Sequence, residues 1–270
     1  MKKIYQYIIG TVLIGIVSSS CSMFGLDVQK DYKYEGTILD PHINISAKEY
    51  LINRGKNPVI ANDTVFKWMQ LGLEYAGINL EEYEKPGRTF VFLSNNAIRV
   101  RNANTGAITA GMWFDLPVME KNPDGSLKLN NGTPVTKIAT KWSDYSVETV
   151  RNYFLYLIAL GDLGFESAKI ENTSFETLLG PGKTAGLESR LGYLVVNNEQ
   201  QPGNSRTLVY DYLTGTGKGF DQEGKINFRM LNSDYSPLQV NSFTTLATSG
   251  IVATNGKVHV SATTVYPSRY

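Results

Sequence analysis

The stretch Asn255-Gly256-Lys257-Val258-His259-Val260 has the sequence of a tight turn that leads into a strand. Asn-Gly pairs favour two-residue hairpin turns, because both residues adopt positive φ angles at low cost. Val258 and Val260 alternate with Lys257 and His259, so the two valines are predicted to share one face of the strand. His259 then points to the other face, where we expect it to bond a neighbouring strand or loop in a structural role.

A second strand is predicted at residues 88–93. The sequence Arg88-Thr89-Phe90-Val91-Phe92-Leu93 is rich in aromatic and β-branched residues, which is typical of a buried strand. Ser94-Asn95-Asn96 follows, and these residue types cap helices well. We therefore expect a helix to begin near Ala97.

Three further helices are expected from caps and apolar spacing. The first covers residues 46–54 with Ser46 as its N-cap, and the second starts at Asn62-Asp63-Thr64 with Asp63 as its cap and ends near Gly77. The third opens at Ser146, with Gly161 and Gly164 marking its end. In the second helix the residues that share one core-facing side are Val65, Trp68, Met69, Gly72 and Ala76.

The remaining segments indicate short strands. Residues 104–142 are β-rich, and Asn122-Pro123-Asp124-Gly125 and Asn130-Asn131-Gly132 are turn sequences within them. β-prone runs then fill the C-terminal part at residues 193–196, 206–212, 225–231, 238–247 and 257–266. Helices early and strands late predict an α+β fold in a single elaborated domain.

Three of these segments together resemble the fasciclin domain family. Residues 88–98, with Asn95 in the turn, are similar to the first family signature, and residues 255–260 with Pro267 are similar to the second. Asn152-Tyr153-Phe154-Leu155-Tyr156 looks like the central region of the family. In the second signature the positions that match are Asn255, Gly256 and His259.

The resemblance covers about residues 43–267 and implies a β-sandwich-like core wrapped by helices. It also implies adhesion or binding rather than catalysis. The chain is longer than the compact family form, and the excess is expected at 104–142, as an inserted β-hairpin region, and at 197–223. Leu157 stands where the family often has a His, and no counterpart of the integrin-binding motifs is present, so integrin binding is not carried over.

Residues 1–20 have the pattern of a secretion signal. The basic start Met1-Lys2-Lys3 precedes an apolar stretch at residues 8–17, which spans roughly 15 Å as a helix, half of a bilayer core. This length is typical of a signal peptide. Ser18-Ser19-Ser20-Cys21 then resembles a bacterial lipobox of the Bacteroides type, which implies that Cys21 carries lipid as the first mature residue, with residues 21–42 as a tether.

Composition excludes several classes of function. The 26 basic and 25 acidic residues give a net charge of +1, which is too weak to draw the chain onto nucleic acid. Because Cys21 is the one cysteine, the chain forms no internal disulfide and no zinc site built on several thiolates. We expect no metal and no cofactor.

No catalytic motif stands out. Gly180-Pro181-Gly182-Lys183-Thr184 lacks the earlier glycine of a phosphate loop, since Thr177 occupies that place. The acidic residues within 81–84 are expected to form a solvated patch rather than the facing carboxylates of a glycosidase. A hydrolase is a third candidate, and it predicts His259 or His42 in a cleft beside a carboxylate and a serine.

Four aromatic residues bracket the expected insertion, namely Trp113, Phe114, Trp142 and Tyr145. Flat aromatic faces stack on sugar rings or anchor a protein partner, because they bury much area at little entropic cost. The alternative is that they cover the small core of the insertion itself. Our hypothesis is that residues 104–145 present a recognition surface.

The sequence as a whole predicts a bacterial outer-membrane lipoprotein without catalysis, held to membrane lipid through Cys21. In one version it is a stand-alone adhesion module for an extracellular protein or glycan. In the other it is an accessory surface subunit of a TonB-dependent nutrient-uptake complex, beside a transporter barrel and other lipoproteins. An exposed apolar patch would favour the subunit, and a groove lined by spaced aromatics would favour glycan or peptide binding.

Overall fold

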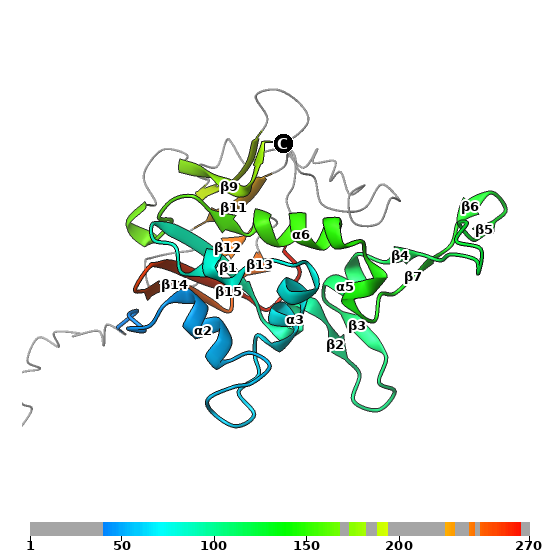
Figure 1. Ribbon diagram of the computed structural model, residues 1–270, viewed down its shortest axis with the longest axis horizontal. Coiled ribbons are helices and arrows are strands. Elements are labelled where there is room, and N and C mark those ends of the chain that lie inside the picture. The colour runs from blue at the N-terminus through cyan, green and yellow to red at the C-terminus, as the bar shows by residue number, and fades with distance from the viewer. Residues whose placement is uncertain are drawn as a thin grey trace, which may run out of the picture. The chain divides into compact units, whose positions relative to one another are not determined.

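The computed structural model describes residues 40–167, 173–181, 188–193, 225–229, 238–240 and 244–265. Helices and a mixed sheet occur together, which confirms the α+β class (Figure 1). The helices, short 3-10 turns included, are α2 (Ala47–Asn53), α3 (Lys67–Tyr75), η1 (Leu80–Tyr83), α4 (Asn95–Ile98), α5 (Met112–Asp115), η2 (Trp142–Asp144), α6 (Val147–Tyr156) and η3 (Phe165–Ser167).

Nine strands form the main sheet in the order β13-β12-β11-β10-β9-β8-β1-β15-β14. Their bounds are β1 (Arg88–Leu93), β8 (Ile158–Ala159), β9 (Thr173–Pro181), β10 (Glu188–Tyr193), β11 (Lys225–Arg229), β12 (Gln239–Val240), β13 (Thr244–Thr245), β14 (Thr248–Ala253) and β15 (Gly256–Ser261). β1 and β15, which carry the two signature segments, are parallel neighbours paired from Arg88↔Gly256 to Leu93↔Ser261.

The sheet curls back on itself. Five strand spacings separate β11 from β15, which would be about 24 Å in a flat sheet. Yet the ring of Phe228 on β11 lies 5.1 Å from the ring of His259 on β15. The two edge strands β13 and β14 are also separated by two residues only, Leu246 and Ala247. The core is therefore one curled sheet, and the finer expectation of a fasciclin-like sandwich stays a prediction.

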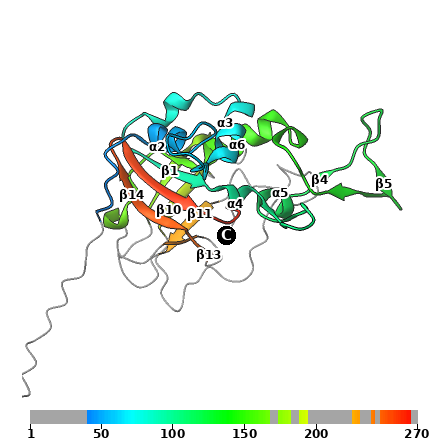
Figure 2. The same cartoon turned by 90° about the horizontal axis from the view of Figure 1, so that it is seen from below.

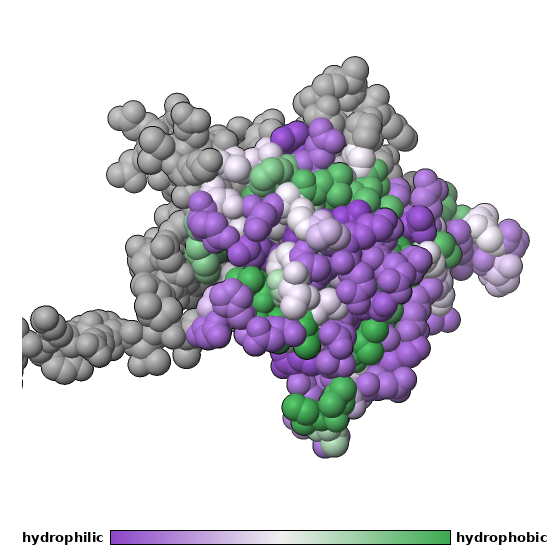
Figure 3. Space-filling model, turned by 60° about the vertical axis from the view of Figure 1, so that its left-hand side comes forward, coloured by the Kyte–Doolittle hydropathy of each residue, from purple (hydrophilic) through white to green (hydrophobic). Residues whose placement is uncertain are grey.

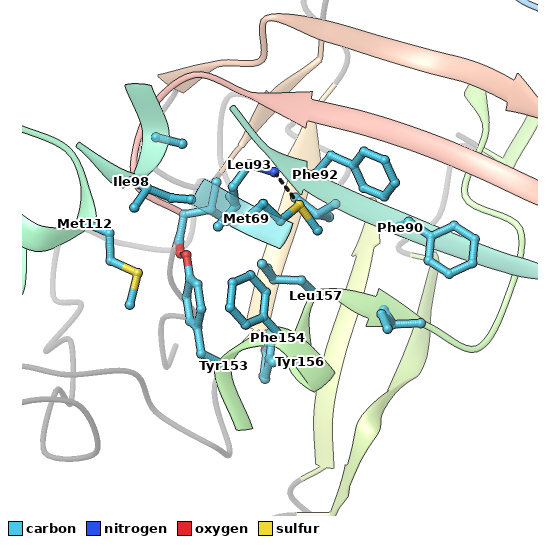
Figure 4. Close-up of a cluster of buried hydrophobic side chains, with 14 of the residues drawn as sticks. Met69, Phe90, Phe92, Leu93, Ile98, Met112, Tyr153, Phe154, Tyr156 and Leu157 are labelled. Carbon is cyan, nitrogen blue, oxygen red and sulfur yellow. Dashed lines mark hydrogen bonds between the residues drawn. The ribbon is translucent and has the colours of Figure 1, made fainter. Parts of the chain in front are cut away.

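Helices α2, α3 and α6 lie together on one side of β1 and β14 (Figure 2). Buried side chains from α3, β1 and α6 meet between these layers, as Figure 4 shows around Met69, Phe92 and Phe154. The backbone N–H of Leu93 donates to the Met69 sulfur at 3.2 Å, which ties the end of β1 to α3.

Two helix expectations need correction. α3 begins at Lys67 rather than at Asp63, because Asn62 adopts a left-handed conformation (φ 69°) and the Asp63 carboxylate accepts a hydrogen bond from Arg54 instead of capping the helix. α6 opens at its Ser146 cap as expected but ends at Tyr156, since the next residues leave the helix to join β1 as strand β8. The Ser46 cap of α2 and the end of α3 at Gly77 (φ 63°) are confirmed.

The Asn255-Gly256 turn also differs from expectation. The hairpin between β14 and β15 forms, but neither residue has a positive φ. Gly256 is required for another reason: a Cβ there would lie 2.0 Å from the carbonyl oxygen of Arg88. The glycine thus permits the close approach of β15 to β1 rather than a left-handed turn.

Candidate functional site

Five aromatic rings, all buried except the half-buried Trp68, form a cluster at the junction of α3, α5, η2 and α6, which we call the aromatic root: Trp68, Trp113, Trp142, Tyr145 and Phe154. Edge-on contacts link successive tryptophans, with ring centroids 5.2 Å apart for Trp68 and Trp113 and 5.7 Å apart for Trp113 and Trp142. Phe154 lies 5.4 Å from Trp142. The T-shaped contacts between the tryptophans are an arrangement that aromatic quadrupoles favour.

Hydrogen bonds fix the root in place. The Trp142 indole N–H donates to the carbonyl of Trp68 at 2.9 Å, and the Tyr145 hydroxyl donates to the carbonyl of Leu116 at 2.7 Å. Burial raises the pKa of the Tyr145 phenol, so it stays neutral. Gly72 in α3 makes room for the cluster, because a Cβ there would lie 2.6 Å from the Phe154 ring and 2.7 Å from Trp142.

The recognition hypothesis for the four predicted aromatics is wrong for three of them. Trp113 is 0% exposed, Trp142 5% and Tyr145 3%, so none offers a face for stacking on a ligand. Only Phe114 reaches solvent, at 43% exposure. The alternative, that these side chains cover a small core of the insertion itself, is also not what is found: Trp113 packs on Trp68 of α3 and Trp142 on Phe154 of α6, so the buried rings belong to the main core.

An extended arm projects from the root at residues 118–138 (Figures 1 and 2). Its short strands are β4 (Val118–Met119), β5 (Leu129–Asn130), β6 (Thr133–Pro134) and β7 (Thr136–Lys137). They pair in two antiparallel ladders, β4 with β7 and β5 with β6. A separate hairpin precedes the arm, formed by β2 (Val100–Arg101) and β3 (Ile108–Ala110).

Backbone bonds and turn residues keep the arm in shape. The N–H of Lys128 donates to the carbonyl of Glu120 at 2.9 Å, and the side chains of these two residues form an ion pair at 2.6 Å. Asn131 (φ 48°) and Gly132 (φ 79°) supply the two positive angles of a tight hairpin turn between β5 and β6. The Asn-Gly pair predicted to turn at this place is confirmed.

The arm exposes apolar side chains that it does not bury against itself. Leu129 is 57% exposed, Leu127 41% and Ile138 39%. Leu127 and Leu129 are two residues apart in an extended segment, so they lie on one face, with Lys128 on the other. Together with Phe114 at its base, this region holds four of the eight large apolar side chains that the described residues expose.

A second apolar tip lies on the loop between α2 and α3. Val59 is 75% exposed and Ile60 69%. This loop is the lowest projection of the described residues in Figure 1, and Figure 3 shows hydrophobic surface at that point. The loop is held by its own bonds, such as that from the N–H of Phe66 to the carbonyl of Arg54 at 2.8 Å.

The two signature asparagines join elements that are distant in the chain. The Asn95 carboxamide accepts from the N–H of Trp68 at 3.1 Å and donates to the carbonyl of Thr64 at 2.8 Å. The Asn255 carboxamide accepts from the N–H of Ala47 at 2.8 Å and donates to the carbonyl of Tyr83 at 2.8 Å. Each side chain therefore links its own turn to backbone groups of elements distant in the chain.

His259 is fully buried and both of its ring nitrogens are engaged. Nδ1 accepts from the N–H of Gly250 at 3.1 Å, and Nε2 lies 2.7 Å from the carbonyl oxygen of Leu163, to which it donates in the neutral tautomer. Burial lowers the pKa of His259 to about 4. No ring nitrogen remains to activate a serine, so the arrangement that a hydrolase predicts is not formed at His259.

The acidic cluster at residues 81–84 is neutralised by neighbouring cations. Glu81 pairs with Lys48 at 2.6 Å, and Glu82 pairs with both Lys85 and Arg88 at 2.7 Å. These bonds to Lys85 and Arg88 lower the pKa of Glu82. The carboxylates are thus tied to partners on the surface and do not face one another across a site.

Within the part of the chain that the structure describes, no group of three or more His, Cys, Asp or Glu side chains could hold a metal ion. No helix in the same residues is long and apolar enough to cross a membrane. Cys21 and the predicted signal and tether up to residue 39 lie outside the described residues, as do the predicted strand at 206–212 and the expected excess at 197–223. No protein-family model matches the chain, and no curated protein matches it.

Proposed function

We propose that this protein is a lipid-anchored, non-catalytic binding protein that engages a partner protein through its arm. The observation that carries the proposal is the exposure of Leu127, Leu129 and Ile138 on a projecting arm. Covering exposed apolar groups with a partner stabilises the complex by about 25 cal/mol for each Å² of apolar surface removed from water. Clustered apolar exposure is typical of protein–protein contact sites.

The arm favours the subunit version of the function over the glycan-binding version. Of the aromatic faces on which a sugar was expected to stack, those of Trp113, Trp142 and Tyr145 are buried. A subunit that stays bound to a larger assembly needs an apolar contact surface, which the arm supplies. The proposed partner is accordingly a component of an outer-membrane, TonB-dependent uptake complex, and free-standing adhesion is the alternative.

Membrane attachment is proposed to come from lipid on Cys21. Several acyl chains on one cysteine give stable anchoring, whereas a single chain binds a membrane only marginally. Metabolic labelling with a tagged fatty acid tests this step. We expect label on the wild-type protein and none after Cys21→Ser; equal labelling of both proteins would contradict the anchor.

Site-specific photocrosslinking tests the arm itself. A photoreactive amino acid is placed at Leu129 in one protein and at Val59 in another, and both are irradiated in the native cell envelope. We expect an adduct with an outer-membrane transport protein from position 129. Adducts from position 59 alone would move the contact to the loop between α2 and α3, and no adduct from position 129 would overturn the proposal.

A further inference from the structure

Arg99, at the end of α4, stacks on the aromatic root. Its guanidinium carbon lies 3.7 Å from the ring centroid of Trp68 and 5.5 Å from that of Trp113. Both Arg99 and Trp68 are half-buried, so one face of the guanidinium is covered while the side chain still reaches solvent. The cation–π contact holds the guanidinium plane in a fixed orientation.

A second arginine lies beside the first. Arg99 has an extended backbone (φ −156°, ψ 137°) and leads directly into β2, so Arg99 and Arg101 are two residues apart in an extended segment whose pairing with β3 is irregular between Val100 and Arg101. Burial lowers the pKa of Arg99, and the positive charge of Arg101 adds to this effect. The Arg99 guanidinium nevertheless keeps its positive charge at neutral pH, and the charge of Arg101 lies near it.

Arg54 is an arginine in the same molecule that both stacks on aromatic rings and pairs with a carboxylate. Its guanidinium lies over the rings of Tyr50 and Phe66, at 5.4 and 5.5 Å. It also donates to the Asp63 carboxylate at 2.9 Å. Arg99 and Arg101, by contrast, have no hydrogen-bonded or ion-paired side-chain partner among the residues that the structure describes.

We propose that Arg99 and Arg101 form a binding site for the carboxylates of an extended acidic peptide. A guanidinium presents paired N–H donors that match a carboxylate in a bidentate geometry. In extended chains, residues two apart are separated by roughly 7 Å, so the Arg-x-Arg spacing equals the spacing of carboxylates in an extended Glu-x-Glu sequence. This site is separate from the arm and does not depend on the proposed function.

A fluorescent peptide of alternating Glu and Ser is the probe, titrated against the full chain in detergent by anisotropy. We expect saturable binding that weakens as salt rises from 0.1 to 0.5 M, because the contact is ionic. Arg99→Gln should weaken it about 10-fold, and Arg99→Lys about 5-fold, since lysine keeps the charge but loses the planar pair of donors. Arg101→Gln should weaken it about 3-fold.

Arg151→Gln is the matched control, because Arg151 is an exposed arginine that donates to the carbonyl of Gly77 on another surface. Arg151→Gln should leave the affinity for the Glu–Ser peptide unchanged. The double variant Leu127→Ser, Leu129→Ser in the arm should leave it unchanged too. Arg101 is exposed, so its variant keeps the test valid if Arg99→Gln fails to fold. The proposal is overturned if a Gln–Ser peptide binds as tightly as the Glu–Ser peptide, or if Arg151→Gln weakens binding as much as Arg99→Gln does. Binding of a polyuronate without binding of the Glu–Ser peptide would overturn it as well.

Discussion

The aromatic root and the arm that projects from it have opposite relations to solvent. The root buries Trp113 and Trp142 among rings and hydrogen bonds, whereas the arm leaves Leu127 and Leu129 about half exposed. Large aromatic side chains in an insertion are therefore no guide to a binding surface by themselves. Here they stabilise the base, and smaller apolar residues that lie between them in the chain form the exposed surface.

The largest expected effect comes from removing a ring of the root. Trp142→Ala should lower the free energy of unfolding by about 3–5 kcal/mol, because it empties a buried site and deletes the bond to the Trp68 carbonyl. Urea unfolding followed by circular dichroism measures this loss. Phe114→Ala is the matched control and should cost much less, since that ring is 43% exposed; equal losses would break the contrast between root and surface.

Acid should destabilise the protein through His259, which is fully buried in the core. The pKa is lowered from 6.5 in the unfolded chain to about 4 in the folded protein, so between these values only the unfolded state takes up the proton. The contribution of His259 to the free energy of unfolding is therefore fully present above pH 6.5 and decreases as the pH falls below that value. The loss reaches about 3 kcal/mol near pH 4.

Urea unfolding of the wild type and of His259→Gln at pH 7, 5 and 4 isolates this contribution. The stability difference between the two proteins should shrink by about 3 kcal/mol from pH 7 to pH 4. A difference that is independent of pH would show that His259 is charged or accessible in the folded state.

Replacing the asparagine in each of the two Asn-Gly pairs should give a smaller loss of stability, and the loss should differ between the core and the arm. Asn255→Ala should cost about 1–3 kcal/mol, because the backbone groups of Ala47 and Tyr83 lose buried hydrogen-bond partners. Asn131→Ala strains only a turn in the arm and should change global stability less. Thermal unfolding of both variants tests this order, and a larger loss at Asn131 would contradict it.

The smallest effect on stability is expected at the arm surface. Leu129→Ser should change the free energy of unfolding by no more than about 0.5 kcal/mol, because the side chain is 57% exposed. Leu93→Ser is the contrasting variant, since that leucine is fully buried in β1 and should cost several kcal/mol. The denaturant midpoints of the two variants, each compared with that of the wild type, measure the two losses of stability.

Local patterns in the sequence predicted much of the secondary structure. The strand at residues 88–93, the Ser46 and Ser146 caps and the Asn131-Gly132 turn depend on neighbours in the chain, so the sequence specifies them directly. The parallel pairing of β1 with β15 and the curl that brings Phe228 to His259 depend on distant contacts. Spacing along one chain carries no signal for such contacts.

The candidate site was harder to predict for the same reason. Burial of Trp142 depends on Gly72, which lies seventy residues earlier in the chain and leaves space for the ring. The arm did leave a local signal, since Leu127 and Leu129 alternate within a polar, turn-rich stretch. That no carboxylate among the described residues pairs with Arg99 left no such signal, because it depends on which acidic side chains the fold brings near it.

The proposed binding of a transport protein through the arm is tested by capturing the protein from detergent-solubilised membranes and comparing the wild type with the Leu127→Ser, Leu129→Ser protein. We predict that the double variant unfolds at the wild-type temperature but recovers at least 10-fold less of the transport protein that accompanies the wild type. Undiminished recovery by a folded double variant would contradict the assignment of binding to the arm.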